Sequence, residues 1–239
     1  MSLTFKNSIF WLFSLYPIEQ YEPDPVKKLM NSMRMTSRCR FNASSRINVI
    51  SKYSFFTTTF LSLGIIFIPL IQNSDVPLHF ISKVLNMMQI FLAVAILVYS
   101  VINGTARYDV RSLALNECGD KVKDLIRQLR DEQHKAQSSS NVLDLTKYHE
   151  DYKEALNESE NHSRLDYLLS ILEMPEDYKI TGLKRAYYKL KACCLYIIPF
   201  ILPTLMIIAE FVFILDLLGI SHVMPSFLGG DPLLPCESK

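Results

Sequence analysis

Three long apolar stretches that contain no charged side chain set the strongest limit on what this chain can fold into. They lie between Lys52 and Asp75, between Lys83 and Arg107, and between Lys191 and Glu210. Because about 20 apolar residues cross the hydrocarbon core of a bilayer as a helix, each stretch is long enough to span a membrane. The sequence therefore predicts an all-α membrane protein with a transmembrane helical hairpin, a cytoplasmic helical hairpin and a third, C-terminal transmembrane helix.

The charges and prolines outside these stretches divide the chain into five segments. We expect a basic N-terminal helical or interfacial segment at 1–52, a transmembrane hairpin at 53–106, a cytoplasmic helical hairpin at 107–191, a third transmembrane helix at 192–220 and a Pro-rich tail at 221–239. The first 52 residues carry eight basic and three acidic side chains, and basic residues also flank the later spans on one side. The excess of positive charge predicts a cytoplasmic N-terminus and an external C-terminus.

Two segments outside the spans have helical patterns of their own. The aromatic run Phe5–Tyr16 is suited to an interfacial helix, or to packing against the cytoplasmic helices. Val122, Leu125, Ile126 and Leu129 recur at helical spacing, and a polar break at 137–141 separates them from a second predicted helix at about 146–173. That helix places Tyr148 and Tyr152 on its buried side. Glu176 and Asp177 suit the first turn of a further helix.

The sequence contains few of the motifs that carry chemistry. It has no Gly-rich phosphate loop, no GxSxG and no paired histidines at metal-binding spacing, so we predict no catalytic residues, no metal and no cofactor. A net charge of +1 also makes direct nucleic-acid binding unexpected. His162, Asp166 and Glu160 could form an acid/base group in a membrane enzyme, or simply the polar edge of a helix.

Polar side chains inside the second span form a seam along one helical face. The residues on that face follow one another at steps of 3, 4, 3, 4 and 3, and they are Asn86, Gln89, Ala93, Ile96, Ser100 and Asn103. Four of the six, Asn86, Gln89, Ser100 and Asn103, can form hydrogen bonds. In the first span Ser54, Thr58 and Ser62 form a second strip, spaced by four. An unpartnered amide is costly in hydrocarbon, so the seam should face protein or water. Hydrogen-bonded helix packing and a water-filled oligomeric pore both fit this pattern.

The third span contains two prolines and ends at two acidic side chains. Pro199 and Pro203 should kink or locally open the helix. Glu210 and Asp216 are expected at the outer boundary, either as solvated end charges or, for Glu210, as a carboxylate ring at the mouth of a cation-permeable pore.

The order of these parts is similar to that of a known family. A basic N-terminal helix precedes a transmembrane hairpin with a short outer loop, and a cytoplasmic helical hairpin follows. The local match is carried by Tyr148, Tyr152, Ala155, Leu156, Asn161, His162, Asp166 and Tyr167. Over about residues 25–190 the chain resembles the SLATT family, which comprises bacterial membrane effectors associated with SMODS nucleotidyltransferases, SLOG sensors and reverse transcriptases in conflict systems.

The resemblance implies an antiphage effector in the bacterial inner membrane. On that basis we expect a homo-oligomeric pore that depolarises or permeabilises the membrane when an upstream sensor is triggered, such as a nucleotidyltransferase product or a reverse-transcriptase system. The third span and the tail depart from the two-span pattern of the family. The alternatives are a non-conducting anchor that recruits a soluble partner, and a membrane enzyme acting on lipid.

Overall fold

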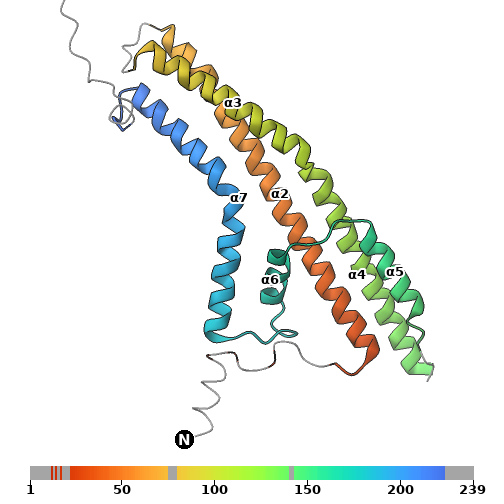
Figure 1. The fold of residues 1–239 in the computed structure, drawn as a ribbon. Coiled ribbons are helices and arrows are strands. Elements are labelled where there is room, and N and C mark those ends of the chain that lie inside the picture. The colour runs from red at the N-terminus through yellow and green to blue at the C-terminus, as the bar shows by residue number, and fades with distance from the viewer. Residues whose placement is uncertain are drawn as a thin grey trace, which may run out of the picture. The chain divides into compact units, whose positions relative to one another are not determined.

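The computed structural model describes residues 22–74, 80–139 and 143–223, together with residues 12, 14 and 17. All the elements in them are helices, namely α2 (Pro25–Gln72), α3 (Ser82–Ala106), α4 (Tyr108–Ser139), α5 (Thr146–Asn157), α6 (Arg164–Glu173) and α7 (Gly182–Leu217) (Figure 1). Three helical stretches, Pro25–Gln72, Ser82–Gln137 and Gly182–Leu217, are long and apolar enough to cross a membrane. The predicted all-α membrane fold is therefore confirmed. Most of the run Phe5–Tyr16 and of the tail lies outside the described residues.

The chain forms two compact units. One, called the polar unit here, comprises Met1–Val49 and Tyr108–Ile198, and the other, the apolar unit, comprises Ile50–Arg107 and Pro199–Lys239. This division differs from the expected segments, because the N-terminal half of α2 packs with the helices that follow Arg107. Helices α2 and α7 each contribute residues to both units.

The core of the polar unit forms where α2 meets α4 and α5. Leu29 and Met33 of α2 are buried against Val122 and Leu129 of α4 and Tyr148 of α5. The apolar stripe expected on α4 is thus buried, and α5 lies along α4 (Figure 1). Apolar burial of this kind stabilises a helix whose other faces are charged.

The helix expected at about 146–173 is two helices, so that prediction was wrong. α5 ends at Asn157 and α6 begins at Arg164. Ser163 caps α6: its side chain accepts a hydrogen bond from the Asp166 backbone, and the Asp166 side chain accepts one from the Ser163 backbone. Polar residues before a cap compete with the helix for backbone hydrogen bonds, which explains the break.

The last helix begins later than the acidic pair Glu176 and Asp177 indicated. α7 starts at Gly182, which has φ of +55°. A Cβ atom at Gly182 would lie 2.1 Å from the carbonyl oxygen of Leu12. Both the left-handed backbone and this close approach favour glycine at the start of α7.

The apolar unit packs α2, α3 and α7 around one core. Leu61 and Ile68 of α2, Leu85 and Leu92 of α3, and Phe213 and Leu217 of α7 are buried together. Outside this core, α3 exposes a band of large apolar side chains that includes Ile90, Val94 and Leu97. Such a surface suits lipid or another membrane helix rather than water.

Candidate functional site

The N-terminal part of the α3 seam, Asn86 and Gln89, forms hydrogen bonds with the C-terminal end of α2. Gln89 donates a hydrogen bond from Nε2 to Oε1 of Gln72 at 3.2 Å, and Gln72 donates from Nε2 to Oδ1 of Asn86 at 3.5 Å. Gln72 therefore serves both seam residues. Among the described residues, the Ser54–Thr58–Ser62 strip makes no side-chain hydrogen bond to Asn86 or Gln89.

The strip mostly satisfies its own helix. Thr58 donates to the carbonyl of Ser54 at 2.9 Å, and Ser62 donates to the carbonyl of Thr58 at 2.7 Å. Ser54 also reaches α3, because its hydroxyl lies 3.1 Å from the hydroxyl of Tyr99. Hydroxyls that bond back to the preceding turn are common in membrane helices and need no external partner.

The other half of the seam is open. Ser100 is exposed and Asn103 is half-buried, and neither side chain has a hydrogen-bond partner among the residues that the structure describes. The neighbouring Gly104 has no atom within 4 Å of the place a Cβ would occupy. An amide in hydrocarbon requires a partner, so a second chain or water must supply one to Asn103 if this part of α3 crosses the bilayer.

The two acidic side chains near the end of α7 are buried. Glu210 is 1% exposed and Asp216 is fully buried, so the expectation of solvated end charges was wrong for both. Asp216 accepts hydrogen bonds from the hydroxyl of Ser221 and, at 3.1 Å, from the backbone of Val223. These hydrogen bonds satisfy the carboxylate of Asp216 in its buried position.

Glu210 has a different environment. Its carboxylate occupies the space beside Gly64 of α2, where a Cβ atom would lie 1.5 Å from Oε1. Neither carboxylate oxygen has a hydrogen-bond partner of normal geometry among the described residues. The side chain also lines an apolar cavity of about 170 Å³ together with Leu61, Leu92 and Met206. The ring of Glu210 carboxylates in an oligomer stays a prediction.

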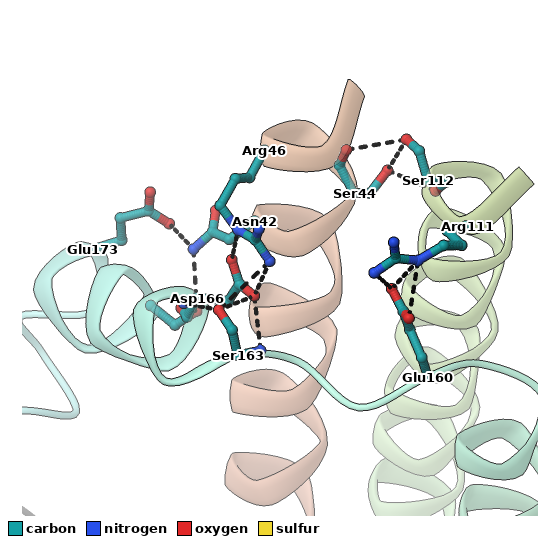
Figure 2. A network of polar contacts seen from close by, with 10 residues as sticks. Asn42, Ser44, Arg46, Arg111, Ser112, Glu160, Ser163, Asp166 and Glu173 are labelled. Carbon is teal, nitrogen blue, oxygen red and sulfur yellow. Dashed lines mark hydrogen bonds and ion pairs between the residues drawn. The ribbon is translucent and has the colours of Figure 1, made fainter. Parts of the chain in front are cut away.

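A network of polar contacts joins α6 to α2 in the polar unit (Figure 2). Arg46 of α2 donates from Nε and Nη2 to the two carboxylate oxygens of Asp166, at 2.8 and 3.0 Å. Asp166 is fully buried and Arg46 is 19% exposed. Two parallel hydrogen bonds between a guanidinium and a carboxylate form a strong, directional pair.

The same carboxylate also holds the cap of α6. Asp166 Oδ2 accepts from the Ser163 backbone at 2.8 Å and lies 2.7 Å from the Ser163 hydroxyl. Burial alone would raise the pKa of Asp166, but the hydrogen bonds from Arg46 and Ser163 outweigh it and hold the pKa below its ordinary value. Asp166 is therefore a structural anion that fixes the start of α6 on α2.

The segment between α5 and α6 is held by an ion pair and by hydrogen bonds to α2 and α4. Arg111 of α4 pairs with Glu160 at 3.0 Å, as Figure 2 shows, and the buried Arg40 donates to the Glu160 carbonyl and to Oδ1 of Asn161. Ser44 and Ser112 join α2 to α4 nearby, with Ser44 donating to the Ser112 carbonyl at 2.8 Å. The loop is thus bound by both long helices of the unit.

His162, Asp166 and Glu160 do not form a common acid/base group in this arrangement. Asp166 is engaged by Arg46, and Glu160 by Arg111. Burial, followed by the charge of Arg40, lowers the pKa of His162, whose buried Nδ1 has no hydrogen-bond partner among the described residues. The described part of the chain also contains no group of three or more His, Cys, Asp or Glu placed to hold a metal ion.

The two tyrosines expected at helix contacts lie on α5. Tyr148 is buried in the core with α2 and α4. The hydroxyl of Tyr152 lies 2.6 Å from that of Thr36 on α2. Sequence reasoning missed the α2 partners of this region, Thr36, Arg40 and Arg46, since nothing local to them indicates which distant residues they meet.

One comparison with known proteins gave a match. A family model described as SMODS and SLOG-associating 2TM effector domain family 5 matches residues 22–215. The match includes nearly all of α7 and so extends beyond the stretch 25–190 that the sequence indicated. Neither the curated proteins nor the solved structures provide a match.

Proposed function

The chain belongs to family 5 of the SMODS and SLOG-associating 2TM effector domains, and from this premise we propose that it is an oligomeric pore. In this proposal the protein sits in the bacterial inner membrane with the polar unit in the cytoplasm. A signal from an upstream sensor opens the pore, and ion flow depolarises an infected cell. The basic excess of the first 52 residues supports this orientation.

The observation that carries the proposal is the open half of the α3 seam. Ser100 and Asn103 have no side-chain partner within the described chain. The exposed side chains around them on α3 are mostly apolar and suit lipid or protein. Copies of the chain arranged around an axis would bring these polar groups together. Water in the lumen would then satisfy them in the open state.

The helices shared by the two units offer a route for the signal. α2 and α7 run without a break from residues of the polar unit to residues of the apolar unit. In this proposal, a rearrangement in the polar unit acts on the apolar unit through these two helices, of which α7 contains Pro199 and Pro203. We propose that the network around Asp166 holds the closed arrangement until the signal arrives.

Asn103→Leu provides the sharpest test, because this side chain has no internal partner to lose. The chain is induced in bacterial cells, membrane potential is followed with a dye, and oligomer size is measured on the purified protein in detergent. The pore proposal predicts that Asn103→Leu assembles normally but no longer depolarises the cells, since an apolar lumen dewets. The control is Ile102→Leu, a neighbouring exposed apolar side chain of the same helix.

Gln89→Leu distinguishes the pore from hydrogen-bonded helix packing as the role of the polar seam. Gln89 pairs with Gln72, so its loss removes a hydrogen bond within the chain, worth about 0.6 to 2 kcal/mol in a membrane protein. Lower protein level in this variant alone would reflect packing. A wild type that assembles and leaves the membrane potential unchanged at high expression, with its sensor system present, would contradict the pore and favour a non-conducting anchor.

A further inference from the structure

A cavity of about 410 Å³ lies between α2 and α4 in the polar unit. Five basic side chains line it: Arg34 and Arg38 of α2, and Lys123, Arg127 and Arg130 of α4. Phe41 of α2 forms part of the wall. This volume falls within the range of small-molecule sites in proteins, about 300 to 1,000 Å³.

Helical spacing explains why the charges gather here. Arg34, Arg38 and Phe41 stand at i, i+4 and i+7 on α2, and Lys123, Arg127 and Arg130 have the same spacing on α4. Residues at this spacing share one helix face. Direct contact between the two helices, such as the 2.9 Å hydrogen bond from Ser37 to the Gly119 carbonyl, sets the two faces side by side.

The acidic side chains nearby neutralise this cluster only at its rim. No carboxylate lines the cavity within the described residues. Arg34 pairs with Asp177 at 3.1 Å, Arg38 with Glu173 at 3.7 Å and Arg127 with Asp124 at 2.7 Å, and all three arginines are more than 40% exposed. Exposed pairs of this kind are weak, so an anion can compete for the guanidinium groups.

Two of the five cations have no ion pair with a described residue. Lys123 stands over the Phe41 ring, with Nζ 5.9 Å from its centre, and Arg130 has no carboxylate within ion-pair distance in the described chain. Like charges around one cavity repel each other, and this repulsion favours a ligand that brings several negative charges. Arginine is also the side chain best shaped to bind phosphate oxygens in pairs.

The remaining wall is suited to a flat, apolar group. Phe41 lies against Gly119, where a Cβ atom would be 2.9 Å from the ring, so glycine leaves room for the aromatic side chain. Ile126 and Met174 complete this part of the lining. An aromatic base can stack on such a surface while its phosphates meet the cations.

We propose that this cavity binds a small phosphorylated ligand with an aromatic base, a molecule of the nucleotide class. The inference concerns the polar unit alone and does not depend on ion conduction. Binding can therefore fail while the pore stands, and the pore can fail while binding stands.

The test uses the purified full chain in neutral detergent, with ATP as the probe and titration calorimetry as the readout. Arg130→Gln removes a cation that has no ion pair within the described chain. We expect the dissociation constant for ATP to rise about tenfold or more. Lys135→Gln on the same helix removes an exposed charge outside the cavity and should leave binding unchanged. Inorganic triphosphate, which lacks the base, should bind more weakly than ATP.

A short-chain phosphatidic acid serves as the second probe, since a lipid headgroup carries the same phosphate. Tighter binding of this lipid than of ATP, with the same loss in Arg130→Gln, would assign the cavity to a headgroup and overturn the nucleotide. Equal ATP affinity in the wild type and Arg130→Gln, or no ATP binding at millimolar concentration, would also overturn the proposal. Thermal unfolding of each variant shows that it is folded before binding is compared.

Discussion

A buried ion pair defines the polar unit at the scale of single residues. Arg46 and Asp166 meet through two hydrogen bonds, and Asp166 has no exposure to solvent. A pair of this kind is weak evidence of net stability, because both charges lose hydration. Removing one partner is costly all the same, because it leaves the other charge buried without compensation.

Asp166→Asn should lower the unfolding free energy by about 3 kcal/mol, the lower end for a broken buried pair because Arg46 keeps some contact with solvent. For a chain of this size, that corresponds to a melting temperature lower by about 6 to 12 °C. Asp124→Asn breaks an exposed pair with Arg127 and should cost less than about 1 kcal/mol. Thermal unfolding in detergent compares the two, and equal shifts would show that Asp166 is not the buried anchor.

The half-buried position of His162 should make the folded protein less stable in mild acid. Burial and the charge of Arg40 lower its pKa in the folded protein, so the unfolded chain binds a proton more readily than the folded one. Its contribution to stability is therefore complete above about pH 6.5, the ordinary value, and is lost as pH falls below it. Asp166, whose folded pKa is also lowered, loses its contribution only at more acid pH, below about 4.

The measurement is the melting temperature between pH 7.5 and pH 5. His162→Gln should flatten the decline because glutamine does not titrate in this range. His149→Gln, on the exposed side of α5, should leave the decline as in the wild type. An identical pH profile for wild type and His162→Gln would exclude His162 as the source.

At the scale of elements, glycine permits the contact between α2 and α7 in the apolar unit. Gly64→Ala would place a methyl group 1.5 Å from Oε1 of Glu210, and the buried carboxylate would have to move. We expect a loss of about 1 to 3 kcal/mol, as for other overpacked sites. Gly104→Ala on α3 meets no atom within 4 Å and should be neutral or stabilising by up to about 1 kcal/mol.

The double variant Gly64→Ala/Glu210→Ala tests the cause. Shortening Glu210 opens the space that the new methyl group needs, so the loss from Gly64→Ala should be smaller in that background. Thermal unfolding of the four proteins gives the coupling. Additive effects would show that Gly64 and Glu210 do not meet in the membrane protein.

The sequence predicted the helices best where the signal is local. Long uncharged stretches and the Val122–Leu129 stripe depend on neighbouring residues only, and both appear as expected. The break before Arg164 was missed because an apolar helical pattern continues on both sides of it. The partners of Asp166 and Gln89 could not be found from spacing, since Arg46 is 120 residues from Asp166 and Gln72 belongs to another helix.

For the whole molecule, the charge distribution predicts the orientation in the membrane. A reporter fused after residue 130 should read cytoplasmic and one after residue 235 should read external, because the N-terminal region carries the basic excess. The two fusions are compared at equal expression. A cytoplasmic reading at 235 would mean that α7 does not cross the bilayer completely.

The ion pair between Arg46 and Asp166 also sets an order for biosynthesis. The 120 residues that separate them include the segment Ile50–Arg107 of the apolar unit. At a synthesis rate of about 20 residues per second, Arg46 leaves the ribosome about 6 s before Asp166, and at about 5 residues per second it leaves about 24 s before. The first two apolar stretches therefore emerge while the polar unit is still incomplete. Until the second half of the chain is synthesised, the N-terminal half of α2 lacks the helices that bury its apolar side.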